Sequence, residues 1–417
     1  MRPKKWTMRE DGNASRAPLI RVARNHTGAD TRKGHPTVRK RLYLLGVLIP
    51  VVAALVAAGV VAATILPARG AHASAICKPT GYIRDGINMT AAIVNPTKGV
   101  GGKVNAGGCN IGVYYGAGHT GTVNGAEIFG ANYFGVVNDG GTVTVKYSRI
   151  HDIGENPFNG DQHGVGIYFT YGSGAHGSIN NNLIWYFQKN GIAVTGNGDS
   201  ATITHNTVIG NGPVDYIAQN GIELGGGATG TITSNLVSGV SYTGPGLTAA
   251  GGILVFGGAC YGPYDLSTNI TISKNVVIGS DVGVYISQGD SSSASPAYCT
   301  PPATTTHINA NRNILDNDAI TNTSGYGVVG QGYQAGISDQ GNGDVLNNNN
   351  ICGVGYAPAA TPPPYLFAID DTQTIGVSES GNLTCTGSAA PTTHNVHTGV
   401  TSGHASAQPA RKASYFL

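Results

Sequence analysis

Charged residues are scarce in this chain, and so are the patterns that mark helices. Only 11% of its 417 residues are Asp, Glu, Lys or Arg, and only two are tryptophan. Stretches with apolar residues at every third or fourth position are almost absent, whereas glycine alone supplies 64 residues. This composition argues against a helical bundle and favours short strands joined by tight turns.

An excess of positive charge is also absent from most of the chain. Of the 24 Lys/Arg and 22 Asp/Glu residues, 12 basic and three acidic ones lie in residues 1–41. Residues 67–417 therefore carry a net charge of −7. An acidic body is not a surface built for nucleic acid, and we expect no nucleic-acid partner.

The chain contains instead a repeated couplet of short segments. An I-x-x-N-x-hydrophobic segment is followed by a G-[I/V]-x-hydrophobic segment. In the segment that begins at Gly221, Ile222 and Leu224 point one way and Glu223 points the other. The recurring aliphatic side predicts stacked coils around one apolar column, which is a β-solenoid. The couplet residues are Ser148, Asn182, Asn206, Asn235, Asn275, Asn313 and Asn349, and Gly166, Gly191, Gly221, Gly252, Gly283 and Gly327.

The asparagines and glycines of the couplet have a structural interpretation. Asn tolerates a left-handed backbone best after Gly, so each Asn is expected at a tight corner between two strands. Stacked Asn side chains can also hydrogen-bond to each other along the axis. The Gly before each second strand is interpreted in the same way.

Three segments carry a resemblance to a known family: Ile203-Thr-His-Asn206-Thr-Val208, Ile232-Thr-Ser-Asn235-Leu-Val237 and Ile272-Ser-Lys-Asn275-Val-Val277. They resemble the repeats of the right-handed parallel β-helix, or pectin-lyase-like, superfamily, over roughly residues 100–385. The resemblance implies an all-β fold, a right-handed parallel β-helix solenoid, whose long outer face commonly binds polysaccharide. It names no single reaction, because this superfamily carries many. We expect a monomer.

An apolar segment near the N-terminus predicts export. Residues 42–66 contain no charged residue, and Arg39, Lys40 and Arg41 precede them directly. Roughly 20 apolar residues span a bilayer, and basic flanks stay in the cytoplasm. We therefore expect one N-terminal transmembrane or signal-anchor helix that holds the protein in the cell membrane with its C-terminal part outside. Secretion after cleavage near Ala73 or Ala75 is the alternative.

The chain divides into four predicted parts. Residues 1–41 form a basic disordered cytoplasmic tail, and residues 42–66 form the span. Residues 76–385 form the β-helix domain, with clear coils at 145–355. Residues 386–417 form a disordered low-complexity tail.

All six cysteines lie in the part predicted to be exported, which favours disulfides. No C-x-x-C spacing supports a metal site. Several pairings are possible, and nearest-neighbour pairing joins positions about one coil apart. That pairing is Cys77–Cys109, Cys260–Cys299 and Cys352–Cys385.

The densest polar cluster lies in one predicted corner loop, residues 151–164. When the glycines that open the second strands are aligned, residues of three adjacent coils share one face of the solenoid. The candidate catalytic residues are Asp161, His163, Lys189 and Glu223. The candidate substrate-binding residues are His151, Asp152, Glu155, Tyr168, Gln219 and Tyr285.

Two reactions fit these residues. A Lys or His base could remove a proton beside a sugar carboxylate while carboxylates or Ca²⁺ hold the substrate, as in lyases and epimerases. Hydrolysis by Asp161 and Glu223 is the second. Asp161-Gln-His163 is distantly similar to the Asp-Pro-His element of alginate epimerases. The paired-Asp and Gly-His-Gly motifs of polygalacturonases are missing, as is a pectate-lyase calcium cluster with its arginine.

We expect an exported protein that binds or modifies an extracellular polysaccharide, with lyase or epimerase chemistry ahead of hydrolysis. The alternative is a non-catalytic structural or adhesive solenoid of the cell surface. An enzyme requires Asp161, His163 and Lys189 within mutual reach, whereas an adhesin leaves them in solvent. In the structural interpretation His163 hydrogen-bonds within its own corner, Lys189 is a solvated charge and the tyrosines pack on strands.

Overall fold

The computed structural model describes residues 76–170, 172–246, 248–291, 299–322, 332–358, 364–390 and 392–393. The predicted tail 1–41, the predicted span 42–66 and the candidate cleavage sites lie outside these residues. Within them, no helix is long and apolar enough to cross a membrane. Their helical structure is one 3₁₀ turn, Val354–Tyr356.

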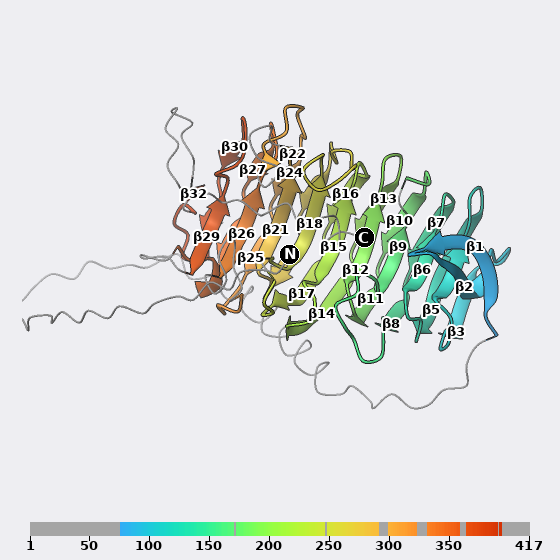
Figure 1. Ribbon diagram of the computed structural model, residues 1–417. Coiled ribbons are helices and arrows are strands. Elements are labelled where there is room, and N and C mark those ends of the chain that lie inside the picture. Colours follow the sequence, from blue (N-terminus) through green and yellow to red (C-terminus); the bar gives the residue numbers. More distant parts are fainter. Residues whose placement is uncertain are drawn as a thin grey trace, which may run out of the picture. The chain divides into compact units, whose positions relative to one another are not determined.

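The described chain winds into coils whose strands stack in parallel along the axis (Figure 1). Sheet A receives one strand from each coil. Its strands, in spatial order, are β1 (Lys78–Arg84), β2 (Ile87–Val94), β4 (Ile111–Tyr115), β6 (Phe134–Asn138), β9 (Val165–Phe169), β12 (Asn190–Thr195), β15 (Asn220–Gly225), β18 (Gly251–Gly257), β21 (Val282–Gln288), β26 (Tyr333–Asp339), β29 (Tyr365–Asp370) and β32 (Thr392–Thr393).

Sheet B receives two strands from each complete coil, joined by a tight corner. The strands before the corner are β3 (Val100–Asn105), β5 (Thr120–Phe129), β7 (Thr142–Lys146), β10 (His176–Asn180), β13 (Ser200–Thr204), β16 (Thr229–Thr233), β19 (Thr271–Ser273), β24 (Asn309–Asn311), β27 (Val345–Asn347) and β30 (Ser378–Ser380). The strands after it are β8 (Arg149–Ile153), β11 (Leu183–Phe187), β14 (Thr207–Val214), β17 (Leu236–Tyr242), β20 (Val276–Ile278), β25 (Ile314–Asp316), β28 (Asn350–Cys352) and β31 (Leu383–Thr384).

The predicted all-β parallel solenoid is therefore confirmed. Two pairs depart from the parallel pattern. β1 pairs antiparallel with β2 at the N-terminal end, and β22 (Asp290–Ser291) pairs antiparallel with β23 (Cys299–Thr300). The antiparallel β1 covers the first edge of sheet A, as the exposed edge of a solenoid requires.

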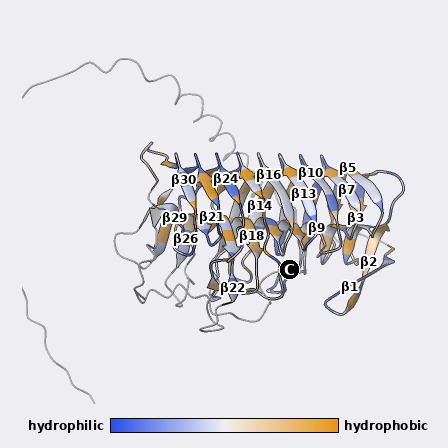
Figure 2. Ribbon diagram, turned by 90° about the horizontal axis from the view of Figure 1, so that it is seen from above, coloured by the Kyte–Doolittle hydropathy of each residue, from blue (hydrophilic) through white to orange (hydrophobic). Residues whose placement is uncertain are grey.

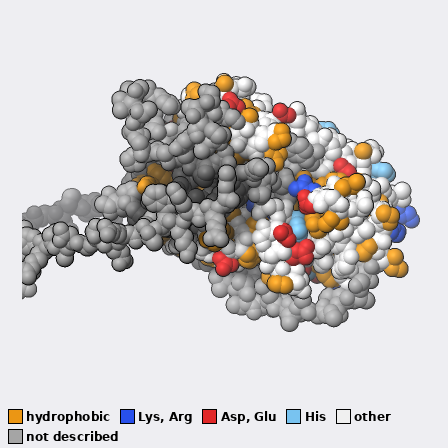
Figure 3. Space-filling view, in the orientation of Figure 1, with side chains coloured by type: hydrophobic (Ala, Val, Ile, Leu, Met, Phe, Trp, Pro, Cys, Tyr) orange, Lys and Arg blue, Asp and Glu red, His pale blue; other side chains and the backbone are white. Residues whose placement is uncertain are grey.

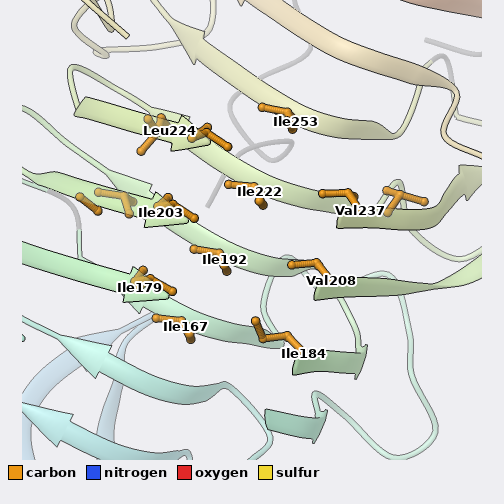
Figure 4. Packing of buried hydrophobic residues seen from close by; sticks show 14 of the residues in the cluster. Ile167, Ile179, Ile184, Ile192, Ile203, Val208, Ile222, Leu224, Val237 and Ile253 are labelled. Atoms are coloured by element: carbon orange, nitrogen blue, oxygen red, sulfur yellow. The ribbon is translucent and has the colours of Figure 1, made fainter. Parts of the chain in front are cut away.

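One continuous aliphatic column fills the coils. Ile192, Ile222 and Ile253 occupy the same register on successive strands of sheet A and are fully buried. Val208 and Val237 from sheet B pack against them (Figure 4). Glu223 lies between Ile222 and Leu224 and points to the outer side, as the alternating pattern predicts. Apolar and polar residues alternate along many strands (Figure 2).

The glycines at the second position of sheet A strands β9, β12 and β15 are required by close packing. Gly166, Gly191 and Gly221 have ordinary backbone angles, which corrects the prediction of a conformational role. A Cβ at these positions would lie 2.5–2.7 Å from the carbonyl oxygen of the next glycine. The next coil therefore approaches too closely for any side chain. The register member after Gly283 is Gly336, whereas the predicted Gly327 lies outside the described residues.

The asparagine column forms the predicted hydrogen-bonded ladder. Asn206 Nδ2 lies 3.0 Å from Asn235 Oδ1, and Asn235 Nδ2 lies 3.0 Å from Asn275 Oδ1. The left-handed residue, however, is the one before each Asn, such as His205 with φ 56° and Ser234 with φ 58°. The Asn is selected for its amide group and not for its backbone angle, which corrects the sequence interpretation.

The disulfides follow the predicted nearest-neighbour pairing. They join Cys77–Cys109, Cys260–Cys299 and Cys352–Cys385, with Cα–Cα distances of 5.5, 5.4 and 5.2 Å. Regular coils also extend beyond the predicted range of 145–355. β3 to β6 already stack in register, with Gly125 (φ 66°) as the left-handed corner residue inside the long β5. At the other end β32 pairs with β29, beyond the predicted domain end at 385.

Candidate functional site

The predicted outward column on sheet A is confirmed by strand register. Ala193 lies between Tyr168 and Glu223, and the column continues through Leu254 to Tyr285. Most members of this column are apolar or aromatic. Glu223, in β15, is the charged member among these five. Lys189 directly precedes β12, the strand that pairs with β15. These two residues form the polar centre of the outer face of sheet A.

Glu223 is held by two amides. Its Oε2 accepts hydrogen bonds from Asn190 Nδ2 at 2.7 Å and from Asn220 Nδ2 at 3.2 Å. Its Oε1 is buried and has no hydrogen-bond partner among the described residues. Burial raises the pKa of Glu223, although the nearby Lys189 and both amides oppose this. Glu223 itself is fully buried, so this oxygen is an unsatisfied acceptor inside the packed outer layer of sheet A.

Lys189 is 4% exposed, and its Nζ donates a hydrogen bond to Ala218 O at 2.9 Å. Burial lowers the pKa of Lys189 to about 8, while the charge of Glu223 opposes the shift. A substantial share of neutral amine is therefore present in mildly alkaline solution. This property distinguishes Lys189 from a solvated surface lysine and suits it to a general base.

Residues that the sequence analysis missed extend this centre. Burial raises the pKa of Tyr264, the charges of Glu223 and Tyr168 add to the shift, and Arg84 opposes it. Arg84, in β1, also shares a side-chain hydrogen bond with Tyr82. Tyr264 therefore lies within electrostatic reach of both Glu223 and Arg84.

The two amide residues also had a signal in the sequence. Asn190-Gly191 and Asn220-Gly221 occupy the same register on adjacent strands. In the two preceding coils the same register position is occupied by the apolar residues Phe134 and Val165, so the change to Asn is a departure from the repeat. The repeated Asn-Gly pair could have indicated a polar site on this face.

His163 and Asp161 are not joined to this centre. His163 Nε2 lies 3.0 Å from Glu155 Oε1, and its ring stacks on Tyr133 with the centroids 3.8 Å apart. Asp161 is exposed, and its Oδ2 accepts a hydrogen bond from Asn159 at 3.0 Å. Among the described residues no hydrogen bond or ion pair connects His163 or Asp161 with Lys189 or Glu223. The four predicted catalytic residues thus fall into separate groups.

Gln188 fixes the turn that carries His163 and Asp161. Its Oε1 accepts the backbone N–H of Glu155 at 3.1 Å, and its Nε2 donates to Asp161 O at 2.8 Å. Gln188 itself is fully buried. The turn is therefore attached to the neighbouring coil by a side chain that is not among the predicted site residues.

His151 and Asp152 belong to sheet B, not to a loop beside Lys189. Both lie in β8, and His151 Nδ1 is 2.6 Å from Asp152 Oδ2. The His151 ring stacks between Phe129 and Trp185, with centroid distances of 5.4 and 4.3 Å. The predicted substrate cluster is therefore divided between two faces of the coil.

Three further candidates are buried. Gln219 is fully buried, and its amide bonds to Phe187 O, Gln188 O and the N–H of Asn211. Tyr168 is fully buried and stacks on Phe134 at 4.9 Å. Tyr285 is 7% exposed within a second apolar cluster on this face. Neither tyrosine presents an exposed ring face for a sugar, because both rings are packed against other side chains.

No group of three or more His, Cys, Asp or Glu residues within the described ranges could hold a metal ion. All six cysteines form disulfides. The expectation of Ca²⁺ therefore has no residue set to support it in this part of the chain.

Figure 3 shows one face of the molecule, on which hydrophobic side chains lie among a few acidic, basic and histidine side chains. Comparison with known families settles the handedness of the coils, because residues 102–262 match a family model described as a right handed beta helix region. This chain contains a right-handed parallel β-helix. The resemblance predicted from the repeats is thereby confirmed.

Solved structures similar to this β-helix include three proteins. The Dettilon tailspike protein (gp208) is 14% identical, with a TM-score of 0.47, and the match covers 75% of this chain and 55% of the tailspike. XylC in complex with xylose is 15% identical, with a TM-score of 0.35 and coverage of 58% and 37%. DFA-IIIase from Arthrobacter chlorophenolicus A6 with GF2 is 11% identical, with a TM-score of 0.39 and coverage of 72% and 69%. Curated protein sequences give no significant match.

Proposed function

We propose that the β-helix binds an extracellular polysaccharide on the outer face of sheet A and modifies it by proton abstraction. The observation that carries the proposal is the pair of Lys189 and Glu223. A buried lysine whose pKa is lowered to about 8 lies within electrostatic reach of a buried carboxyl group that keeps one oxygen without a partner. Perturbed titratable groups of this kind gather at functional sites.

The residues divide the chemistry between them. Neutral Lys189 takes the proton from the carbon beside a sugar carboxylate, and the electron pair moves onto that carboxylate. Arg84 supplies positive charge on this face, and Glu223 Oε1 accepts a sugar hydroxyl. Expulsion of the glycosidic oxygen completes a lyase reaction, and return of a proton to the opposite side completes an epimerase reaction. We place lyase or epimerase chemistry ahead of hydrolysis for this reason.

Hydrolysis has weaker support. It needs two carboxyl groups flanking one glycosidic bond, about 5–10 Å apart. Asp161 is exposed and bonded to Asn159, while Glu223 is buried and bonded to Asn190. Among the described residues, no hydrogen bond and no shared partner connects the carboxyl groups of Asp161 and Glu223.

A non-catalytic cell-surface solenoid is the second candidate, and one observation favours it. His163 and His151, the two candidate histidines, are each bonded to a carboxylate of their own coil. Satisfied pairs of this kind stabilise a scaffold as readily as they serve a reaction.

The proposed location is outside the cell. Three disulfides in the described residues fit an oxidising compartment. The apolar segment 42–66 with its basic flank supplies the membrane anchor in this proposal, and cleavage near Ala73 or Ala75 would release the β-helix instead.

The test is turnover on a panel of polysaccharides, with unsaturated-product absorbance and reducing ends recorded together. Lys189→Met should lower the rate by at least about 100-fold, the effect expected on losing a general base. The wild-type rate should rise as the pH increases through about 8, because Lys189 acts in its neutral form. Glu223→Gln should weaken binding of the polymer.

Lys98→Met is the matched control, since Lys98 is exposed and lies outside the site. It should keep full activity, and the melting temperature of Lys189→Met should stay close to that of the wild type. A Lys189→Met protein that turns over normally would exclude the proposed base. Loss of stability without loss of specific activity would assign Lys189 to the scaffold.

A further inference from the structure

Three aromatic side chains that the proposed reaction does not use lie together at one corner of three consecutive coils, and a fourth, Trp185, stacks on His151 with the centroids 4.3 Å apart. Trp185 and Tyr186 come from β11, Phe158 from the turn before β9, and Tyr216 from the turn before β15. The Phe158 ring lies 4.8 Å from that of Tyr186 and 6.3 Å from that of Tyr216. We call these four residues the aromatic corner.

The backbone of β11 places two neighbouring aromatic residues on the outside. Ile184 and Phe187 point into the core and are fully buried. Tyr186 between them adopts a left-handed backbone with φ 51°, which is unusual for a bulky residue. Trp185 and Tyr186 therefore both project outward, where regular alternation would allow one of them to do so. The same corner position is left-handed in the two preceding coils, at Gly130 and Asp152, so the angle belongs to the regular corner and Tyr186 is the bulky residue placed there.

The rings of the aromatic corner are neither buried nor part of the core. All four are half-buried, and none belongs to the three clusters of buried hydrophobic residues. The core aromatics Phe169 and Phe187 are, by contrast, completely covered. Apolar ring surface from three coils thus remains in contact with water at one place, which is typical of a binding surface.

The charge around these rings selects against an anionic ligand. The turns that carry Phe158 and Tyr216, residues 154–164 and 210–219, contain Glu155, Asp161 and Asp215 but no Lys or Arg. Neutral hydrogen-bonding groups are close by. Asn211 Nδ2 donates to the Tyr216 hydroxyl at 2.9 Å, and Asn159 is half-buried in the same turn as Phe158.

We propose that the aromatic corner binds a neutral sugar unit of a polysaccharide. The ring faces would cover the C–H groups of the sugar, and the amide and hydroxyl groups would bond to its hydroxyls. Neighbouring coils are about 4.8 Å apart, so three coils extend over about 10 Å along the axis. This length accommodates a short stretch of polymer. The site adds to the proposed function and does not depend on catalysis by Lys189.

Trp185 provides the readout. The chain has two tryptophans, so in a Trp6→Phe background of the full chain Trp185 is the single one. Titration with a neutral polymer, xylan or β-glucan, should give a saturable change in Trp185 fluorescence, and polygalacturonate should give none. Tyr186→Ala and Tyr216→Leu should each weaken binding about fivefold to tenfold. Tyr216→Leu keeps apolar bulk without the ring, so it separates stacking from folding.

Tyr147→Ala is the matched control, because Tyr147 also has a left-handed backbone, with φ 50°, and is 62% exposed at a different corner. It should bind as the wild type does. A fluorescence response to polygalacturonate alone, no saturable response to any polymer, or equal weakening by Tyr147→Ala would overturn the proposal. Lys189→Met should bind neutral polymer normally. If Lys189→Met loses turnover while Tyr186→Ala and Tyr216→Leu still bind neutral polymer normally, the proposed reaction stands and this inference fails.

Discussion

A single asparagine of the ladder uses its whole amide group. Asn235 Oδ1 accepts the backbone N–H and the Nδ2 of Asn206, at 2.9 and 3.0 Å. Asn235 Nδ2 donates to Ile203 O and Asn275 Oδ1, both at 3.0 Å. The side chain thus supplies two donors and two acceptor positions to a buried corner. No other residue type of this size can replace all four bonds.

Replacing Asn235 by Ala should therefore destabilise the β-helix by about 3 kcal/mol, because buried donors and acceptors on both neighbouring coils lose their partners. The free energy of unfolding in urea measures this. Asn197→Ala is the control, since Asn197 is exposed and its backbone is not left-handed. An Asn235→Ala protein as stable as this control would show that water replaces the ladder.

At the scale of the strand, register could be predicted from the sequence and burial could not. The period of two and the aligned glycines correctly placed Tyr168, Ala193 and Glu223 opposite one another. Whether an outward side chain meets water depends on what packs on the outer face, which is a non-local property. Tyr168 therefore proved to be buried against Phe134. The pairing of His163 with Glu155 likewise depends on how Gln188 attaches the turn.

The glycine column sets how closely neighbouring strands and sheets approach. A Cβ on Gly221 would lie 2.4 Å from Val237 Cγ1 and 2.5 Å from Gly252 O. One of these atoms is backbone of the next coil and cannot move without shifting the stack. Overpacking of this kind costs about 1–3 kcal/mol.

Gly221→Ala should accordingly lower the thermal midpoint by several degrees, and thermal unfolding followed by circular dichroism measures it. Gly99→Ala is the matched control. A Cβ there meets only Thr122 O at 3.6 Å, an ordinary contact, and the backbone angle is unstrained. Equal midpoints for the two variants would mean that the coils can separate to admit a methyl group.

Across the whole β-helix, carboxyl groups are buried along the axis. Asp199 and Asp281 lie at the corners of different coils, and burial raises their pKa values to about 7 and about 6. Asp339 continues the inward column after Ile286, so the interior becomes acidic near the C-terminal end. Burial, and then the charge of Asp344, raises the pKa of Asp339 as well. The folded chain therefore holds protons that an unfolded chain releases near pH 4.

The sign of the pH dependence follows from these shifts. Between about pH 4 and 7 the folded state binds more protons than the unfolded state, so stability is greatest at the acidic end and is lost as the pH rises through 6 and 7. The melting temperature should be higher at pH 5 than at pH 8. Asp339→Asn should raise stability at pH 8 and flatten the curve, because its amide keeps an acceptor for Gly341 N–H and donates to Asp344. Asp265→Asn, at an exposed residue, should leave the curve unchanged. A melting temperature that increases from pH 5 to pH 8 would contradict the assignment of protonated carboxyl groups to the folded interior.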